Sequence, residues 1–272
     1  MALAPWKVRV TADGSSTLGA VHATVELVNR AVGTFVWPWA WFRDDTIVGD
    51  PVTDWNDRTP NERHLTLLSG SGSGTIIQTA GPDGTTAVDS DITTAPFNGR
   101  SLSHIADTYT FTAGFTLVIV LRTPSTADRF NQQFFTADGR GWAEFDWFPT
   151  IPEIILLSHA TFPDLAAYYE EDLGGSFPVW TAVVAVMQNG QEPSVFANAA
   201  EMSPVVEKAS LTEPVRAAEF GVKLSRSGEA IAEMIVFDGV YDPATDPAPF
   251  GDEGSMTINE YLAGRYPSLV VV

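Results

Sequence analysis

Two long apolar stretches constrain the fold of this chain more than any other feature. Residues 115–123, FTLVIVLRT, are largely apolar and rich in β-branched side chains, a composition typical of a strand buried on both faces. Residues 180–190, WTAVVAVMQNG, form a second stretch of this kind, which ends in an Asn-Gly turn. Both stretches predict strands near the centre of a β-sandwich.

Shorter strand signals, separated by turns, continue along the chain. Residues 7–10 and 22–28, KVRV and HATVELV, alternate between apolar and polar side chains. Residues 216–224 and 230–239 follow nearer the C-terminus, with a Ser-Arg-Ser-Gly turn between them. Short strands divided by turns of Gly, Asp, Asn, Ser and Pro are typical of sandwiches and jelly rolls, so we predict an all-β fold.

One helix is predicted, close to the C-terminus. Within SMTINEYLAGRYPSL, Thr257 and Glu260 have the spacing of a capping box, in which each side chain bonds the other residue's backbone N–H. Apolar residues then recur at helical spacing until Pro267 ends the pattern. We expect this short helix to pack its apolar side against the sandwich.

Charge and composition exclude several classes of function. The 272 residues carry a net charge of −19, and a surface this acidic repels phosphate, so neither nucleic acid nor an anionic membrane is an expected partner. Cysteine is absent, which excludes disulfides, thiolate metal sites and a thiol nucleophile. The chain lacks the run of about eighteen apolar residues that a membrane-spanning helix needs. Its first residues, MALAPWKVRVTADG, lack the apolar run of a signal peptide, so we expect folding in a cytoplasm.

Two segments resemble a known family in the order of their motifs. The first joins VTDWNDRTPNERHLTLLSG at 52–70 to AVDSDITTAPFNGRSLSH at 87–104, and the second joins GEAIAEMIVFDGVYDPATDP to INEYLAGRYP. Together they resemble concanavalin A-like, laminin-G-like domains of the kind found in bacteriophage structural proteins. The positions that carry the first segment's resemblance are Trp55, Asp57, Leu65, Phe97, Gly99 and Leu102.

The resemblance implies a two-sheet antiparallel jelly-roll sandwich over residues 45–272, with the short helix near its end. Two features depart from the family pattern: RTPNER stands where a Gly-rich turn is usual, and residues 243–254 form an acidic insertion. Residues 1–44 lie outside the pattern. We predict that they form a separate N-terminal β segment that serves as an attachment arm.

The stretch GWAEFDWFP at 141–149 is the candidate for carbohydrate contact. In a strand, Trp142, Glu144 and Asp146 share one face, and an indole beside two carboxylates suits a sugar-binding groove. The same alternation is also typical of an ordinary strand with one wet face. Glycosidases of the resembling fold carry Glu-x-Asp-x-Glu or Glu-x-Asp-x-x-Glu, but here Phe148 or Pro149 fills the last position, so we predict no catalytic residue.

A dense aromatic stretch is the candidate interface. Phe35, Trp37, Trp39 and Trp41 share a face if this strand is regular, although Pro38 favours an edge strand or a bend. We expect the four rings to be buried, either in the core of the same chain or against an assembly partner.

No metal site or cofactor is predicted. The four histidines have no ligand-like spacing, which argues against zinc. Calcium stays an alternative because acidic residues gather in loops, but they lack the spacing of an EF-hand, and solvated loops are the favoured interpretation. These clusters are Asp44–Asp45–Asp50, Asp83–Asp89–Asp91 and Asp238–Asp242–Asp246.

The sequence and the resemblance together favour a non-enzymatic structural component of a bacteriophage virion, either a capsid decoration or a tail or fibre protein. The expected partners are other virion proteins and further copies of this chain, with host surface glycans as a further class. The expected location is the virion, assembled in the host cytoplasm. The alternatives are a carbohydrate-binding lectin module and, behind it, a divergent glycoside hydrolase.

Overall fold

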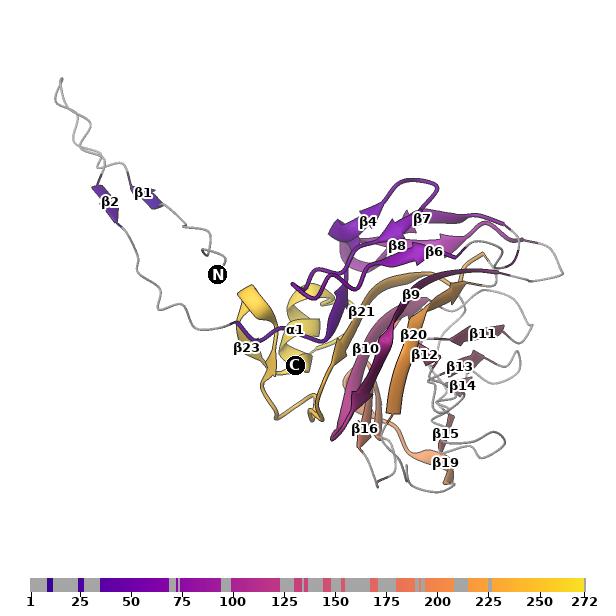
Figure 1. Cartoon of the computed structure of the whole chain (residues 1–272). Coiled ribbons are helices and arrows are strands. Elements are labelled where there is room, and N and C mark those ends of the chain that lie inside the picture. The colour runs from indigo at the N-terminus through magenta and orange to yellow at the C-terminus, as the bar shows by residue number, and fades with distance from the viewer. Residues whose placement is uncertain are drawn as a thin grey trace. The chain divides into compact units, whose positions relative to one another are not determined.

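The computed structural model describes the chain in two units, Met1–Val36 and Trp37–Val272 (Figure 1). In the first unit, β1 (Arg9–Thr11) and β2 (Thr24–Glu26) form an antiparallel pair in which Arg9 lies opposite Glu26. For the strands between residues 130 and 170, the backbone pairing alone is described. The described residues are 9–11, 24–26, 35–68, 72, 74–93, 99–122, 130–133, 135–136, 144–147, 153–154, 167–170, 180–188, 191, 194–207, 215–224 and 227–271.

The larger sheet of the second unit is antiparallel and contains both apolar stretches. Its strands are β18 (Ala200–Glu201), β17 (Ser194–Ala197), β16 (Trp180–Gln188), β10 (Gly114–Arg122), β21 (Ile231–Phe237), β8 (Thr86–Ser90) and β7 (Ile76–Ala80), in that order, and β3 (Ala40–Phe42) also pairs with β21. The apolar strand β10 lies between β16 and β21, with Val118 opposite both Val184 and Ile235. The predicted central position of these stretches is confirmed.

A second antiparallel sheet packs against the first. Its order is β12 (Phe135–Thr136), β20 (Val215–Leu224), β9 (Arg100–Phe111), β6 (Leu65–Leu67), β5 (Asp54–Trp55) and β4 (Ile47–Val48). Leu102 and Phe220 of this sheet share one buried cluster with Leu117, Ile119 and Met234 of the larger sheet. The core of a sandwich therefore lies between the two sheets.

The outer face of the larger sheet is covered as well. Val118, Val120 and Ile235 form a second buried cluster with residues of α1 (Ile258–Arg265). Figure 1 shows α1 on the side of β21 that faces away from β9 and β20. Because one face meets the second sheet and the other meets the helix, β10 needs apolar side chains on both faces, which explains its composition.

The helix begins as the sequence predicts. The Oγ1 of Thr257 accepts a hydrogen bond from the backbone N–H of Glu260 at 3.1 Å, and the Oε2 of Glu260 accepts one from the backbone N–H of Thr257 at 2.8 Å. This reciprocal pair is the capping box. Among the described residues, no helix is long and apolar enough to cross a membrane.

Short elements complete the described backbone. Three 3₁₀ turns are η1 (Asp44–Thr46), η2 (Pro82–Gly84) and η3 (Gly251–Glu253). The remaining strands are β22 (Ala248–Pro249) paired with β23 (Ser255–Met256), β11 (Phe130–Gln133) paired with β13 (Glu144–Trp147), and β15 (Ala167–Glu170) between β14 (Glu153–Ile154) and β19 (Pro204–Glu207). The all-β, two-sheet antiparallel sandwich with a short C-terminal helix is confirmed.

The boundary between the two units lies earlier than the predicted one at residue 44. Strand β3 belongs to the sandwich, because it pairs with residues 234–236 of β21 and is buried throughout. The pairing has a simple cause. Strand β10 occupies one edge of β21, and β8 pairs with the other edge at Ile231 alone, so β3 supplies hydrogen bonds to the rest of that edge.

Candidate functional site

A buried carboxylate organises the loop that follows β5. Asp57 accepts hydrogen bonds through Oδ1 from the backbone N–H groups of Trp41 and Thr59, at 3.0 and 2.9 Å. Its Oδ2 accepts from the Thr59 hydroxyl at 2.8 Å and from the Arg63 backbone N–H at 3.0 Å. Four hydrogen bonds to one carboxylate fix the backbone of this loop, including the backbone position from which the Arg63 side chain extends.

The Arg63 side chain lies over an aromatic ring. Its guanidinium carbon is 4.2 Å from the ring centroid of Trp39, within the range of a cation–π contact, and 5.9 Å from that of Tyr109. Nη1 of Arg63 donates to the backbone oxygen of Trp39 at 2.7 Å, and the Asn61 side chain donates to the same oxygen at 2.9 Å. The ring and the backbone oxygen of Trp39 therefore both hold the guanidinium.

A phenol and an exposed carboxylate complete this region. Tyr109, near the end of β9, packs its ring 5.3 Å from that of Trp39, measured between centroids. Its hydroxyl donates to Oδ2 of Asp238, which directly follows β21. This hydrogen bond, with burial and the charge of Asp238, raises the pKa of Tyr109 to about 12, while Arg63 acts in the opposite direction.

A second tyrosine lies beside the same carboxylate. Burial, followed by the charges of Asp238 and Asp246, raises the pKa of Tyr241 above its ordinary value. The turn between them is fixed by Thr116, whose hydroxyl donates to the Gly239 oxygen and accepts from the Tyr241 N–H, both at 3.0 Å. We name Arg63, Tyr109, Asp238 and Tyr241 the Asp238 group. It combines one cation, one exposed carboxylate and two half-buried phenols, as expected of a site that recognises a polar ligand.

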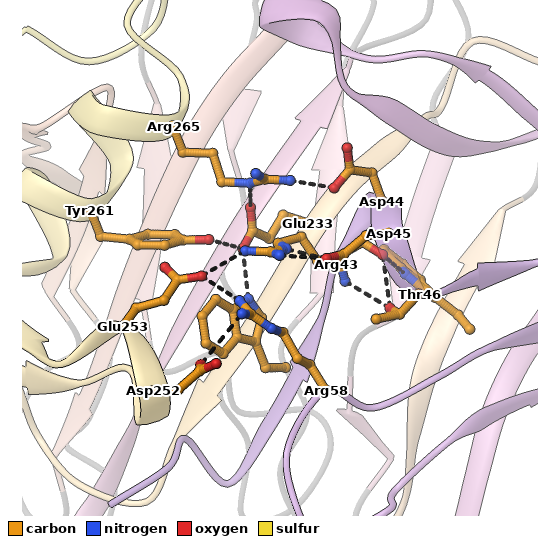
Figure 2. A network of polar contacts seen from close by, with 12 residues as sticks. Arg43, Asp44, Asp45, Thr46, Arg58, Glu233, Asp252, Glu253, Tyr261 and Arg265 are labelled. Carbon is orange, nitrogen blue, oxygen red and sulfur yellow. Dashed lines mark hydrogen bonds and ion pairs between the residues drawn. The ribbon is translucent and has the colours of Figure 1, made fainter. Parts of the chain in front are cut away.

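A second polar network surrounds Glu233, on the outer face of the larger sheet (Figure 2). The Glu233 side chain is fully buried, yet it receives four donors. Trp41 donates through Nε1 at 2.7 Å, Arg265 through Nε at 2.9 Å and Tyr266 through its hydroxyl at 2.6 Å, and the Tyr261 hydroxyl donates as well. Such a carboxylate is satisfied and closed to ligands, so it acts as the attachment point of α1 on β21.

The rim of this network is a set of arginines between aromatic rings and carboxylates. Arg58 lies 4.4 Å from the Trp41 ring centroid, and Figure 2 shows Arg43 and Arg58 meeting at Glu253 of η3. The two guanidinium groups donate to the same Glu253 oxygen, at 2.8 and 2.5 Å. Burial opposes the charge of Arg43, but the hydrogen bond and charge of Asp45 outweigh it and raise its pKa. These arginines are paired with carboxylates of the same chain, so the rim stabilises the contact between η3 and the segments that carry Arg43 and Arg58.

The predicted carbohydrate-contact residues lie largely outside the described side chains. Glu144 and Asp146 belong to β13, which pairs with β11 so that Asp146 lies opposite Asn131 and Glu144 opposite Gln133. This confirms a strand at that point. Trp142 is outside the described residues, and a sugar-binding role for the three positions stays a prediction.

The four aromatic residues of the candidate interface do not share one face. Trp39 is 5% exposed and packs in the core between the sheets, whereas Trp41 is 0% exposed and packs in the cluster under α1. Trp37 packs partly buried against that same cluster, and Phe35 is 53% exposed. The bend that Pro38 favours is consistent with this split. The interior alternative therefore holds for Trp39 and Trp41, and a partner contact stays a prediction for Phe35.

The acidic residues of the predicted clusters form ion pairs and hydrogen bonds with different partners. Within the described ranges, no group of three or more His, Asp or Glu side chains is placed to hold a metal ion. Asp44 pairs with Arg265, Asp45 with Arg43 and Asp89 with Arg122, while Asp242 accepts from the backbone N–H groups of Ala244 and Thr245. His64 accepts from the Asp57 N–H through Nδ1 at 3.0 Å, which assigns it to the same loop.

Sequence reasoning did not find the Asp238 group. Its members come from the loop after β5, the end of β9 and the turn after β21, so the sequence separates them widely. In the sequence, Arg63 lies at the end of RTPNER, which stands where a Gly-rich turn is usual, and Asp238 lies in an acidic cluster. The available signal was the aromatic-Asp pair, Phe237 and Asp238, at the end of a buried strand, which marks where the chain leaves the core.

No family model and no curated relative matches this chain. Among solved structures, domain 4 of AbnA, a GH43 extracellular arabinanase from Geobacillus stearothermophilus in complex with arabinotriose, is similar with a TM-score of 0.48 and 17% identity, covering 77% of this chain and 96% of that one. The binding domain of botulinum neurotoxin DC in complex with rat synaptotagmin II follows with a TM-score of 0.44 and 9% identity, over 75% of this chain and 49% of that one. Trypanosoma rangeli sialidase gives a TM-score of 0.39 and 11% identity, over 75% of this chain and 30% of that one.

These likenesses are to sandwich-containing proteins, and at TM-scores below 0.5 they carry no argument about function. They also provide no link to a bacteriophage particle, so a place in a virion stays a prediction.

Proposed function

We propose that this chain is a non-enzymatic module that binds carbohydrate, and that the Asp238 group is its binding site. The observation that carries the proposal is the exposed carboxylate of Asp238, placed beside a phenol and a guanidinium that stacks on Trp39. A sugar presents hydroxyl groups, which both donate and accept hydrogen bonds, and apolar ring faces, which pack on aromatic rings.

Each part of a sugar has a counterpart in this group. Oδ2 of Asp238 accepts from Tyr109, while within the described residues no group donates to Oδ1, which leaves that oxygen for a ligand hydroxyl. The guanidinium of Arg63 supplies donors. Tyr109 and Tyr241, both half-buried, supply ring surface as well as hydroxyl groups.

The group is also held ready before a ligand arrives. Asp57 fixes the backbone of Arg63, and Thr116 fixes the turn that carries Asp238 and Tyr241. A site whose polar groups are already in place loses less conformational entropy on binding. Two organised loops on two different sheets are therefore well suited to recognition.

Binding without cleavage is part of the proposal. Retaining hydrolysis of a glycoside uses two carboxyl groups about 5 Å apart, one as nucleophile and one as acid and base. The Asp238 group contains one carboxylate, already hydrogen-bonded to a phenol. It has the composition of a recognition site, and we expect bound oligosaccharides to be recovered intact after long incubation.

A glycan array with matched variants tests the proposal. Asp238→Asn removes the charge at nearly constant size, and we expect it to weaken binding of any positive glycan roughly tenfold or more, because a hydrogen bond to a charged group is lost. Asp252→Asn is the control, since Asp252 is also exposed and pairs with Arg58 at 3.4 Å in the other network.

Two outcomes would contradict the proposal. Binding that survives Asp238→Asn but is lost in Glu144→Gln would place the site on β13, where Trp142, Glu144 and Asp146 are the predicted contacts. A wild-type chain that binds no glycan would reject carbohydrate recognition altogether. The leading hypothesis from the sequence, a structural component of a virion that binds other virion proteins, would then take precedence.

A further inference from the structure

Arg63 differs from Arg43, Arg58, Arg122 and Arg265 in its electrostatic surroundings. In the part of the chain that the structure describes, no carboxylate lies within ion-pair distance of its guanidinium. The arginines of the other networks all have such partners. These pairs are Arg43 with Asp45 and Glu253, Arg58 with Asp252 and Glu253, Arg122 with Asp89, and Arg265 with Asp44 and Glu233.

The hydrogen-bonding capacity of Arg63 is also only partly used. A guanidinium has five N–H donors, and among the described residues only Nη1 finds an acceptor, the backbone oxygen of Trp39. Burial lowers the pKa of Arg63, although the charges of Asp57, Tyr109 and Asp238 act in the opposite direction. A half-buried cation of this kind gains stability from an anionic partner that reaches it.

The exposed carboxylate of Asp238 has one oxygen in use, and its charge acts on Arg63. Oδ2 of Asp238 accepts a hydrogen bond from the Tyr109 hydroxyl, and among the described ion pairs none joins Asp238 to Arg63. The cation and the carboxylate therefore stand as two separate recognition elements on one surface. A ligand that satisfies both would present an anion to Arg63 and hydroxyl groups to Asp238.

We propose that Arg63 binds the carboxylate of an acidic sugar, so that this module recognises glycans containing a uronic or sialic acid. This inference rests on the proposed function and names the ligand class for the same site. The planar guanidinium can donate two parallel hydrogen bonds to the two oxygens of a carboxylate. Neutral sugars have no carboxylate to accept them. Acidic sugars also keep the hydroxyl groups that can donate hydrogen bonds to Asp238.

Because the chain is strongly acidic overall, a preference for acidic glycans would indicate a local cationic site. With 34 acidic and 15 basic residues, the protein repels anionic ligands at long range. A preference for acidic glycans therefore has to come from a local cation, and not from the general field of the molecule. Arg63 is the half-buried arginine beside the exposed carboxylate, which makes it the residue to change.

The test is titration calorimetry with pairs of oligosaccharides that differ only at the carboxylate. The probes are glucuronic acid-terminated and N-acetylneuraminic acid-terminated trisaccharides and their methyl esters, with the glucose-terminated equivalent of the glucuronic acid probe as a neutral reference. For at least one acid we expect the ester to bind roughly tenfold or more weakly, because a charged hydrogen-bonded pair is lost. Which acid shows the difference identifies the source of the carboxylate.

Substitution of Arg63 links this preference to the residue. In Arg63→Gln, we expect the acid and the ester to bind with similar affinity, so that the ratio between the two falls toward one. Arg63→Lys keeps the charge and the aliphatic stem without the fork, and we expect an intermediate preference. Arg58→Gln is the matched control, because Arg58 also stacks on a tryptophan but is ion-paired.

The possible failures are distinguishable. Equal binding of acid and ester by the wild-type chain, or an unchanged ratio in Arg63→Gln, overturns the inference while leaving carbohydrate binding in place. Absence of binding to every glycan rejects the proposed function itself. If Arg63→Gln does not fold, as shown by thermal unfolding, Arg63→Lys and the esters still decide the outcome.

Discussion

At the scale of single residues, Glu233 shows how one buried charge can fix a tertiary contact. Its two oxygens receive donors from Trp41 of β3 and from three residues of the C-terminal helix region, Tyr261, Arg265 and Tyr266. Burial, then the charge of Glu233 and the hydrogen bonds to it, raise the pKa of Tyr261 and Tyr266 well above the ordinary value. The tyrosines therefore stay protonated donors, and the carboxylate is the acceptor they share.

We predict that Glu233→Gln destabilises the fold by about 3 kcal/mol or more, because it breaks a buried ion pair with Arg265 and places an amide group among donors. Urea unfolding measures the loss. Glu260→Gln is the control, since the capping box accepts Gln at this exposed position, and we expect a change within about 0.5 kcal/mol. Equal losses of unfolding free energy in the two variants would contradict a stabilising role of the buried Glu233 network.

The Tyr109 and Asp238 pair gives a prediction about pH. The pKa of Tyr109 is raised to about 12 from an ordinary value near 10, so its contribution to stability is complete below pH 10 and is lost as pH rises through 12. Asp238→Asn removes the charge, and we expect the pKa of Tyr109 to return toward 10. Ultraviolet titration of the tyrosines, with Tyr109→Phe to identify the group, measures the change. A Tyr109 pKa that stays at about 12 in the variant would contradict this hydrogen bond.

At the scale of elements, the described helix shows how a local signal and a tertiary contact combine. Thr257→Ala removes one side of the capping box, and the expected loss of stability is about 1 kcal/mol. Thermal or urea unfolding checks it. Thr245→Ala is a suitable control, because Thr245 is exposed in a nearby turn. Its backbone N–H donates a hydrogen bond to Asp242, and the substitution leaves that bond unchanged. A loss as large in the control would mean that the cap adds nothing specific.

The elements also show what the sequence can predict. The stretches that became β10 and β16 could be identified because both of their faces are covered, and the helix because its cap is local. The place of β3 could not, since alternating aromatics predict one buried face, whereas Trp41 and Phe42 pack into two different cores on the two sides of this strand. The Asp238 group depends on how β9 and β21, in different sheets, bring their ends together, and no local pattern encodes that packing.

At the scale of the whole molecule, the chain divides into two units, Met1–Val36 and Trp37–Val272. We predict that removal of residues 1–36 leaves the unfolding midpoint of the sandwich unchanged, because that segment forms a unit of its own. Removal of residues 1–44 also deletes β3 with the buried rings of Trp39, Trp41 and Phe42. Each such ring contributes about 3–5 kcal/mol, which together approach the whole stability of a domain, so this chain should fail to fold.

Circular dichroism and light scattering on the two truncated chains separate the possibilities. If residues 1–36 form the predicted attachment arm, the shorter truncation stays folded and loses any self-association of the full chain. A folded monomer in both the full chain and the shorter truncation would remove self-assembly through that arm and leave the proposed glycan binding as the function to test. A stable fold after removal of residues 1–44 would contradict the assignment of β3 to the sandwich, because the exposed edge of β21 and the space left by two tryptophans are incompatible with a closed core.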